Sequence, residues 1–115
     1  DFNTCVGEDA MFSNTSGSNN IAIGDHAGQN NNGSNNILLG ARVMRSATNS
    51  NGNIIIGKEA GSILGTGGNN IIIGNGRNPS ADSSNNLLIG DSSHSTVVIA
   101  GKTISFNLDG TVTWS

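Results

Sequence analysis

Side chains that could carry out catalysis are few in this sequence, and their positions follow a repeat. A glycosidase needs two carboxylates roughly 5 to 10 Å apart on either side of a sugar bond. Glu8, Asp25 and Asp91 each come directly after a recurring glycine, and Lys58 occupies the same place elsewhere. The repeat therefore explains these acids, and we predict that the chain is not an enzyme and has no catalytic residue. The eight acids are Asp1, Glu8, Asp9, Asp25, Glu59, Asp82, Asp91 and Asp109.

The sequence also lacks the usual signatures of a metal or cofactor site. His26 and His94 lie far apart, without the short spacing typical of paired ligands. No regular aspartate series marks a calcium-binding roll repeat. Cys5 is the single cysteine, which rules out an intrachain disulfide framework. We therefore expect no metal and no cofactor.

Composition limits the classes of partner. The chain has 115 residues, of which 34% are hydrophobic and 11% charged, and its net charge is −3. The five basic residues are spread along the chain, so we expect no nucleic-acid binding. No apolar run approaches the roughly 20 residues that cross a bilayer, so we expect no membrane insertion. The start at Asp1 suggests a fragment of a longer chain.

A short aliphatic block that ends in glycine recurs along the chain. The block glycines are Gly7, Gly24, Gly40, Gly57, Gly74 and Gly90, at spacings of 17, 16, 17, 17 and 16 residues. An imperfect seventh block follows at Val97-Val98-Ile99. Five near-equal intervals with matched flanks indicate an internal repeat.

Each repeat has the chemistry of a β-strand. The blocks are three residues long, rich in β-branched residues and bounded by Asn and Gly. Small residues such as Ala27, Val43 and Ala60, three positions after the glycine, suit a narrow interior. We predict an all-β fold, a parallel β-solenoid of about six 16–17-residue coils with strands about 4.8 Å apart.

An asparagine precedes five of the blocks and would form a column along the stack. These residues are Asn20, Asn36, Asn53, Asn70 and Asn86. Stacked amides can hydrogen-bond from coil to coil, as in cross-β ladders. Ligand binding is the alternative role, but we favour the structural ladder because the asparagines flank the strand in coil after coil.

The block is apolar at all three positions, which predicts a strand buried on both faces. Successive residues of a strand point to opposite sides. We expect the first and third residues, such as Ile54 and Ile56, to fill the interior, and the second residue to contact other chains. An aliphatic ladder left in water would aggregate, so this pattern predicts an oligomer. The predicted interface residues are Cys5, Ala22, Leu38, Ile55, Ile72, Leu88 and Val98, with Cys5 a buried thiol.

The end of the chain changes character. We assign residues 1–101 to the repeat domain and residues 102–115 to a C-terminal β-hairpin or strand extension that caps the solenoid or links to a further domain. Around the turn signal Asp109-Gly110, a three-residue loop would pair Phe106 with Val112 and Ile104 with Trp114.

The repeats resemble those of two families. Ile23-Gly24-Asp25-His26-Ala27 and its counterpart at residues 56–60 are similar to the head repeat of trimeric autotransporter adhesins. Ser18–Gly24 is similar to repeats of bacteriophage tail fibres, and Asn before the block with Leu or Ile in its middle favours this second family. Both resemblances imply a left-handed parallel β-roll with three chains around one axis and no catalysis in the repeat.

The resemblance implies a function in attachment. We expect a structural and receptor-binding segment of a trimeric phage tail fibre in the virion, which contacts a glycan or outer-membrane protein of a bacterium. The alternative is an adhesin head on a bacterial cell surface, which binds host matrix or cells. A hexapeptide transferase would need an aliphatic residue every six positions. The candidate exposed binding residues, which can also be read as a solvated surface, are His26, Arg42, Arg45, Lys58, Glu59 and Arg77.

Overall fold

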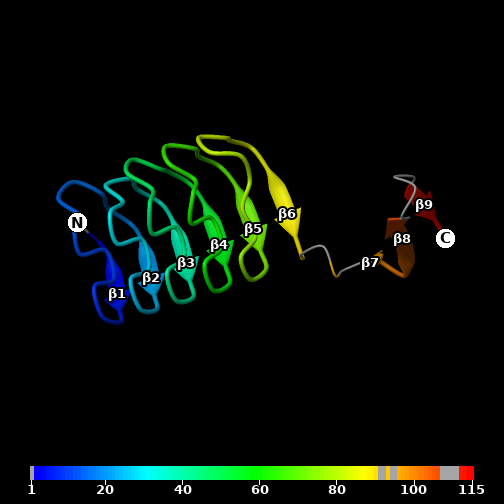
Figure 1. The fold of residues 1–115 in the computed structure, drawn as a ribbon, viewed down its shortest axis with the longest axis horizontal. Coiled ribbons are helices and arrows are strands. Elements are labelled where there is room, and N and C mark those ends of the chain that lie inside the picture. Colours follow the sequence, from blue (N-terminus) through cyan, green and yellow to red (C-terminus); the bar gives the residue numbers. More distant parts are fainter. Residues whose placement is uncertain (1, 91–92, 94–95, 107–111) are drawn as a thin grey trace.

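The computed structural model describes residues 2–90, 93, 96–106 and 112–115, and it confirms the all-β parallel solenoid. Six three-residue strands form one sheet in chain order, one strand from each coil (Figure 1). Their bounds are β1 Thr4–Val6, β2 Ile21–Ile23, β3 Ile37–Leu39, β4 Ile54–Ile56, β5 Ile71–Ile73 and β6 Leu87–Ile89. All five neighbouring pairs are parallel, with block residues in register, as Ile54 opposite Ile71 illustrates.

The interior of the solenoid is formed by the middle residues of β2 to β6, so the predicted assignment of faces was wrong. Ala22, Leu38, Ile55 and Ile72 are fully buried within their own chain. Opposite them lie Ala27, Val43 and Ala60, which confirms the prediction of a narrow interior, together with Met11, Met44, Ala47 and Leu64. The coil is too narrow to enclose two block residues of each strand, and it encloses the middle one.

Three other predicted interface residues have different surroundings. Leu88 is half-buried and packs against the same core, so it is also an interior residue. Cys5, on β1, is exposed in the single chain, and its burial against other chains stays a prediction. Partial burial still raises the pKa of its thiol. The side chain of Val98 lies outside the described residues.

The predicted asparagine ladder is confirmed, and it extends to Asn3. The Oδ1 atom of Asn36 accepts two hydrogen bonds from Asn53, from the backbone N–H at 3.0 Å and from Nδ2 at 3.1 Å. Asn53 Oδ1 accepts the same pair from Asn70, at 3.0 Å each. Because these amides are buried, each bond satisfies a polar group that would otherwise be costly. The column therefore fastens successive coils together.

The residue before each of the five predicted ladder asparagines makes a tight turn. Asn19, Asn35, Asn69 and Asn85 have φ between 56° and 62°, and Gly52 has φ 69° at the same position. Asparagine and glycine tolerate this left-handed conformation best. In an Asn-Asn pair, the first residue therefore forms the turn and the second residue hydrogen-bonds to the next coil.

The last strands form a second sheet. β7 Thr96–Ile99, β8 Lys102–Phe106 and β9 Val112–Trp114 are antiparallel in the order β7-β8-β9. The imperfect seventh block, Val97-Val98-Ile99, is not part of the parallel sheet, because β7 pairs with β8 in the second sheet. Phe106 lies opposite Val112 and Ile104 opposite Trp114, the predicted register. The predicted loop falls on residues 107–111, outside the described part.

Candidate functional site

The outer face of the six-stranded sheet carries two parallel aliphatic stripes. The stripes are the first and third residues of the strands, which point away from the interior. Most are exposed, and Leu39 and Ile56 are half-buried. We call this surface the aliphatic face. Its residues are Thr4, Val6, Ile21, Ile23, Ile37, Leu39, Ile54, Ile56, Ile71, Ile73, Leu87 and Ile89.

The aliphatic face has the geometry of a protein contact surface. Its rows follow the strand spacing of about 4.8 Å, so the face is about 24 Å long from β1 to β6. Ile54 and Ile71 are 37% and 39% exposed, and Leu87 and Ile89, near one end, reach 68% and 55%. No charged residue interrupts either stripe. A continuous exposed aliphatic surface is typical of an interaction site.

The exposed aliphatic surface thus lies on the opposite side of the strands from the residues that were predicted to contact other chains. The sequence contained a signal for this outcome. Asn53 and Ile55 are two residues apart and point to the same side of the chain. Since the ladder amide of Asn53 is buried, Ile55 must also point inward and Ile54 outward. If the inward positions of a strand are assigned one residue out of step, every side chain is placed on the wrong face.

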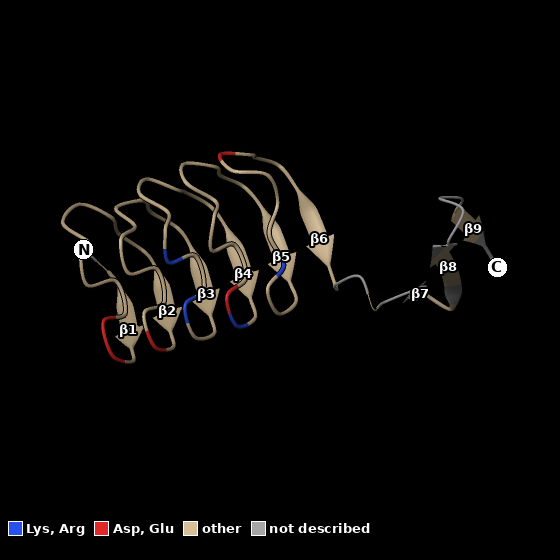
Figure 2. Ribbon diagram, in the orientation of Figure 1, with Lys and Arg blue, Asp and Glu red and all other residues tan. Residues whose placement is uncertain are grey.

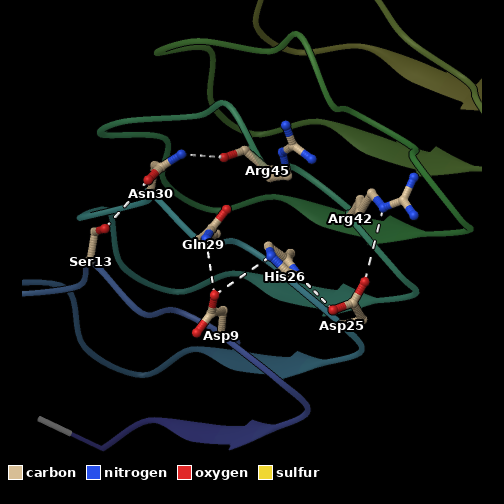
Figure 3. A network of polar contacts seen from close by, with 8 residues as sticks. All are labelled: Asp9, Ser13, Asp25, His26, Gln29, Asn30, Arg42 and Arg45. Atoms are coloured by element: carbon tan, nitrogen blue, oxygen red, sulfur yellow. Dashed lines mark hydrogen bonds and ion pairs between the residues drawn. The ribbon is translucent and has the colours of Figure 1, made fainter.

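The second feature is a column of charged side chains in the turns after the strands, where Figure 2 shows acidic and basic residues gathered. We call it the charged column: Asp9, His26, Arg42 and Glu59, each two residues after a block glycine. His26 Nδ1 lies 2.5 Å from Asp25 Oδ1, and His26 Nε2 lies 3.5 Å from Asp9 Oδ2. Arg42 Nη1 lies 2.9 Å from Glu59 Oε1, and Arg42 Nε lies 3.9 Å from Asp25 Oδ2. Figure 3 shows two of these contacts, His26 with Asp9 and Arg42 with Asp25, which join neighbouring coils.

The residues of the charged column have a left-handed backbone conformation. The φ angles of Asp9, His26, Arg42 and Glu59 are 53°, 55°, 55° and 59°, and Gly76 takes the next position with φ 62°. The fold requires this conformation, since His26, Arg42 and Glu59 each donate a backbone N–H to the coil before, as Arg42 N does to Asp25 O at 2.7 Å. Glycine or asparagine would adopt it at lower energy. Aspartate and histidine also adopt this conformation more readily than most residues do, so Arg42 and Glu59 are the column residues least suited to it.

The structure thus brings three of the six candidate binding residues, His26, Arg42 and Glu59, into one network. Lys58 is exposed, and its backbone N–H donates to Asn75 Oδ1 at 3.0 Å. Arg77 differs from expectation: it is half-buried, and its Nε atom is buried without a hydrogen-bond partner among the described residues.

Arg45 lies beside the charged column, at a hollow between two coils. Arg42, Arg45 and Ser46 from the turn after β3 line it on one side. Glu59, Ser62 and Ile63 from the turn after β4 line it on the other. Sequence reasoning identified both arginines and Glu59 but missed the two serines and Ile63, because their nearness depends on the stacking of the coils.

In comparisons with known proteins, no family model, curated protein or solved structure matches the chain. Within the described residues, no group of three or more His, Cys, Asp or Glu side chains could hold a metal ion. The same part of the chain has no helix of the length and apolar character that spanning a membrane requires.

Proposed function

We propose that the chain is a structural and receptor-binding segment of a trimeric bacteriophage tail fibre, which attaches the virion to a bacterial surface. The aliphatic face is the observation that carries this proposal. It is too apolar to stay in water, and its rows repeat at the spacing of the coils. A second copy lying parallel presents the same rows at the same interval. Copies of this chain are therefore natural partners for one another.

Three copies around one axis suit a fibre. Cyclic symmetry keeps all three solenoids parallel, so the aliphatic faces converge on the axis and the turns face outward. The trimer comes from the resemblance to tail-fibre repeats, and the uninterrupted face supports it. In this arrangement the charged column and the hollow remain on the outside, where they can reach a glycan or an outer-membrane protein of the host.

The head of a trimeric autotransporter adhesin is the second candidate. The observation that favours it is the resemblance of residues 23–27 and 56–60 to the adhesin head repeat. The two functions share their assembly and differ in the surface that they contact. The fibre binds bacteria, whereas the adhesin head binds host cells or matrix.

Solution mass and cell binding test the proposal together. Multi-angle light scattering should give three times the chain mass of 11.7 kDa. Fluorescently labelled protein should bind bacteria from a strain panel in preference to host cells. Loss of binding after periodate treatment would identify a glycan receptor, and loss after protease treatment a protein. A mass of one or two chains, or preferential binding to host cells, would contradict the fibre.

A further inference from the structure

We propose that the hollow between the turns after β3 and β4 binds a hexuronic acid, as one residue of a surface glycan. This inference rests on the proposed attachment function, and it assigns to that function a site and a class of ligand. The recognition groups are the guanidinium of Arg45, the hydroxyls of Ser46 and Ser62, the carboxylate of Glu59 and the side chain of Ile63.

Arg45 supplies an uncompensated positive charge at the hollow. Its neighbour Arg42 is held by Glu59 and Asp25 at 2.9 and 3.9 Å. In contrast, the guanidinium of Arg45 has no ion-pair or hydrogen-bond partner among the described residues, and only its backbone carbonyl accepts a bond, from Asn30 (Figure 3). A planar guanidinium binds a carboxylate through two parallel hydrogen bonds. The free fork of Arg45 therefore favours a ligand with a carboxylate.

The other lining groups suit the ring of a sugar. Ser62 donates its hydroxyl to Asn78 Oδ1 at 3.3 Å, so its own oxygen can still accept a bond. Glu59 binds Arg42 through Oε1, which leaves Oε2 to accept from a ring hydroxyl. Ile63 is 53% exposed and offers an apolar surface for the C–H face of the ring. One ligand thus needs a carboxylate, several hydroxyls and an apolar face, and a hexuronic acid has all three.

The size and position of the hollow agree with a single sugar residue. Its volume is about 240 Å³, below the roughly 300–1,000 Å³ of pockets for drug-sized ligands. None of its lining residues belongs to the aliphatic face, so assembly through that face leaves the hollow free. A trimer would carry three such sites, and a polymer that engages several of them gains affinity by avidity.

Calorimetric titration with monosaccharides tests the site directly. Methyl glucuronide and methyl galacturonide are compared with methyl glucoside and methyl galactoside, which lack the carboxylate. We expect at least one uronide to bind at least about tenfold more tightly than the matching neutral glycoside. The neutral glycoside lacks the carboxylate and therefore cannot form the charged hydrogen bond with Arg45. Arg45→Gln should weaken uronide binding by about the same factor. Lys58→Gln, which removes an equal charge outside the hollow, should change it less than about twofold.

Circular dichroism of both variants verifies that the solenoid is folded. Equal affinity for uronides and neutral glycosides would overturn the inference, as would unchanged binding by folded Arg45→Gln. An equal loss of uronide affinity in Lys58→Gln would also overturn the inference, because the loss would then reflect the overall charge of the protein rather than a contact in the hollow. If Arg45→Gln fails to fold, Ser46→Ala replaces it, and unchanged binding in that variant rejects the site.

Solution mass of the same samples separates this inference from the proposed function. A trimer that binds bacteria but does not distinguish uronides from neutral sugars overturns the uronic acid site and leaves the fibre intact. If the protein is a monomer that binds uronides selectively, the uronic acid site is supported and the fibre proposal is contradicted.

Discussion

The two sides of each strand are built from the same kind of residue and have opposite surroundings. In Ile54-Ile55-Ile56, the middle isoleucine is fully buried, the first is 37% exposed and the third is half-buried. β5 repeats the pattern, with Ile72 buried between exposed Ile71 and Ile73. Hydrophobicity alone therefore does not distinguish the core of the coil from its outer face. The neighbouring asparagine does, because its buried amide fixes which side points inward.

The difference implies separate roles for the two sides. The middle residues hold each chain together, whereas the aliphatic face is available to join chains. Substitutions that exchange isoleucine for a charged residue should therefore have different consequences at adjacent positions.

Ile55→Asp should prevent folding. A carboxylate at this fully buried site has no polar partner, and its desolvation exceeds the cost of an ordinary core truncation, about 2–5 kcal/mol. Small domains have only about 5–15 kcal/mol of stability in total. Circular dichroism should show loss of strand signal at all temperatures. A cooperative melt close to that of the unmodified protein would place Ile55 outside the core.

Asn53→Ala should destabilise the solenoid by about 2–4 kcal/mol, because it removes the acceptor of two buried donors of Asn70. Asn49→Ala is the matched control, since Asn49 is exposed and its side chain is outside the ladder. Chemical denaturation of both variants measures the difference. Equal stability of the two would show that the ladder contributes little.

Ile54→Asp combined with Ile71→Asp should keep the fold and abolish assembly. Both side chains lie on the aliphatic face, where charges can remain in water in a single chain but not in a contact between chains. Light scattering should report a fall in mass to one chain, with the strand signal retained. Ile63→Asp changes an exposed isoleucine outside the stripes and should leave the mass unchanged. If the double variant has the same mass as the unmodified protein, the aliphatic face does not form the contact between chains.

Lys58→Gln combined with Glu59→Gln should change stability by less than about 1 kcal/mol. The ion pair of Glu59 with Arg42 is exposed, and such pairs contribute about 0–1 kcal/mol. Lys58 contacts the next coil through its backbone N–H, which bonds to Asn75, so the substitution of its side chain retains this hydrogen bond. Differential scanning calorimetry measures the effect. A loss of several degrees in the melting temperature would give these charges a structural role.

Much of the architecture could be predicted because it is encoded locally. The glycine spacing specifies the coil length, and the three-residue blocks specify the strands. A side chain at Gly57 would come within 2.6 Å of the carbonyl oxygen of Gly74, so the close approach of the coils keeps this column as glycine. The amide column at Asn36, Asn53 and Asn70 followed from the same spacing, since residues one repeat apart in a solenoid lie one above another.

The hydrophobic pattern did not decide which side of the strand is the interior, and the tertiary structure did, through the buried amide of Asn53 and the packing across the coil. Alternation along a strand separates two faces but does not orient them, and here both faces are aliphatic. The choice depends on what lies across the coil, where Ala27, Val43 and Ala60 leave room for one block residue and exclude two. The hollow at Arg45 has the same origin: its walls belong to two turns that the stacking of the coils brings together. The sequence determined the repeat and its hydrogen bonds, and packing across the coil determined which surface remained for other molecules.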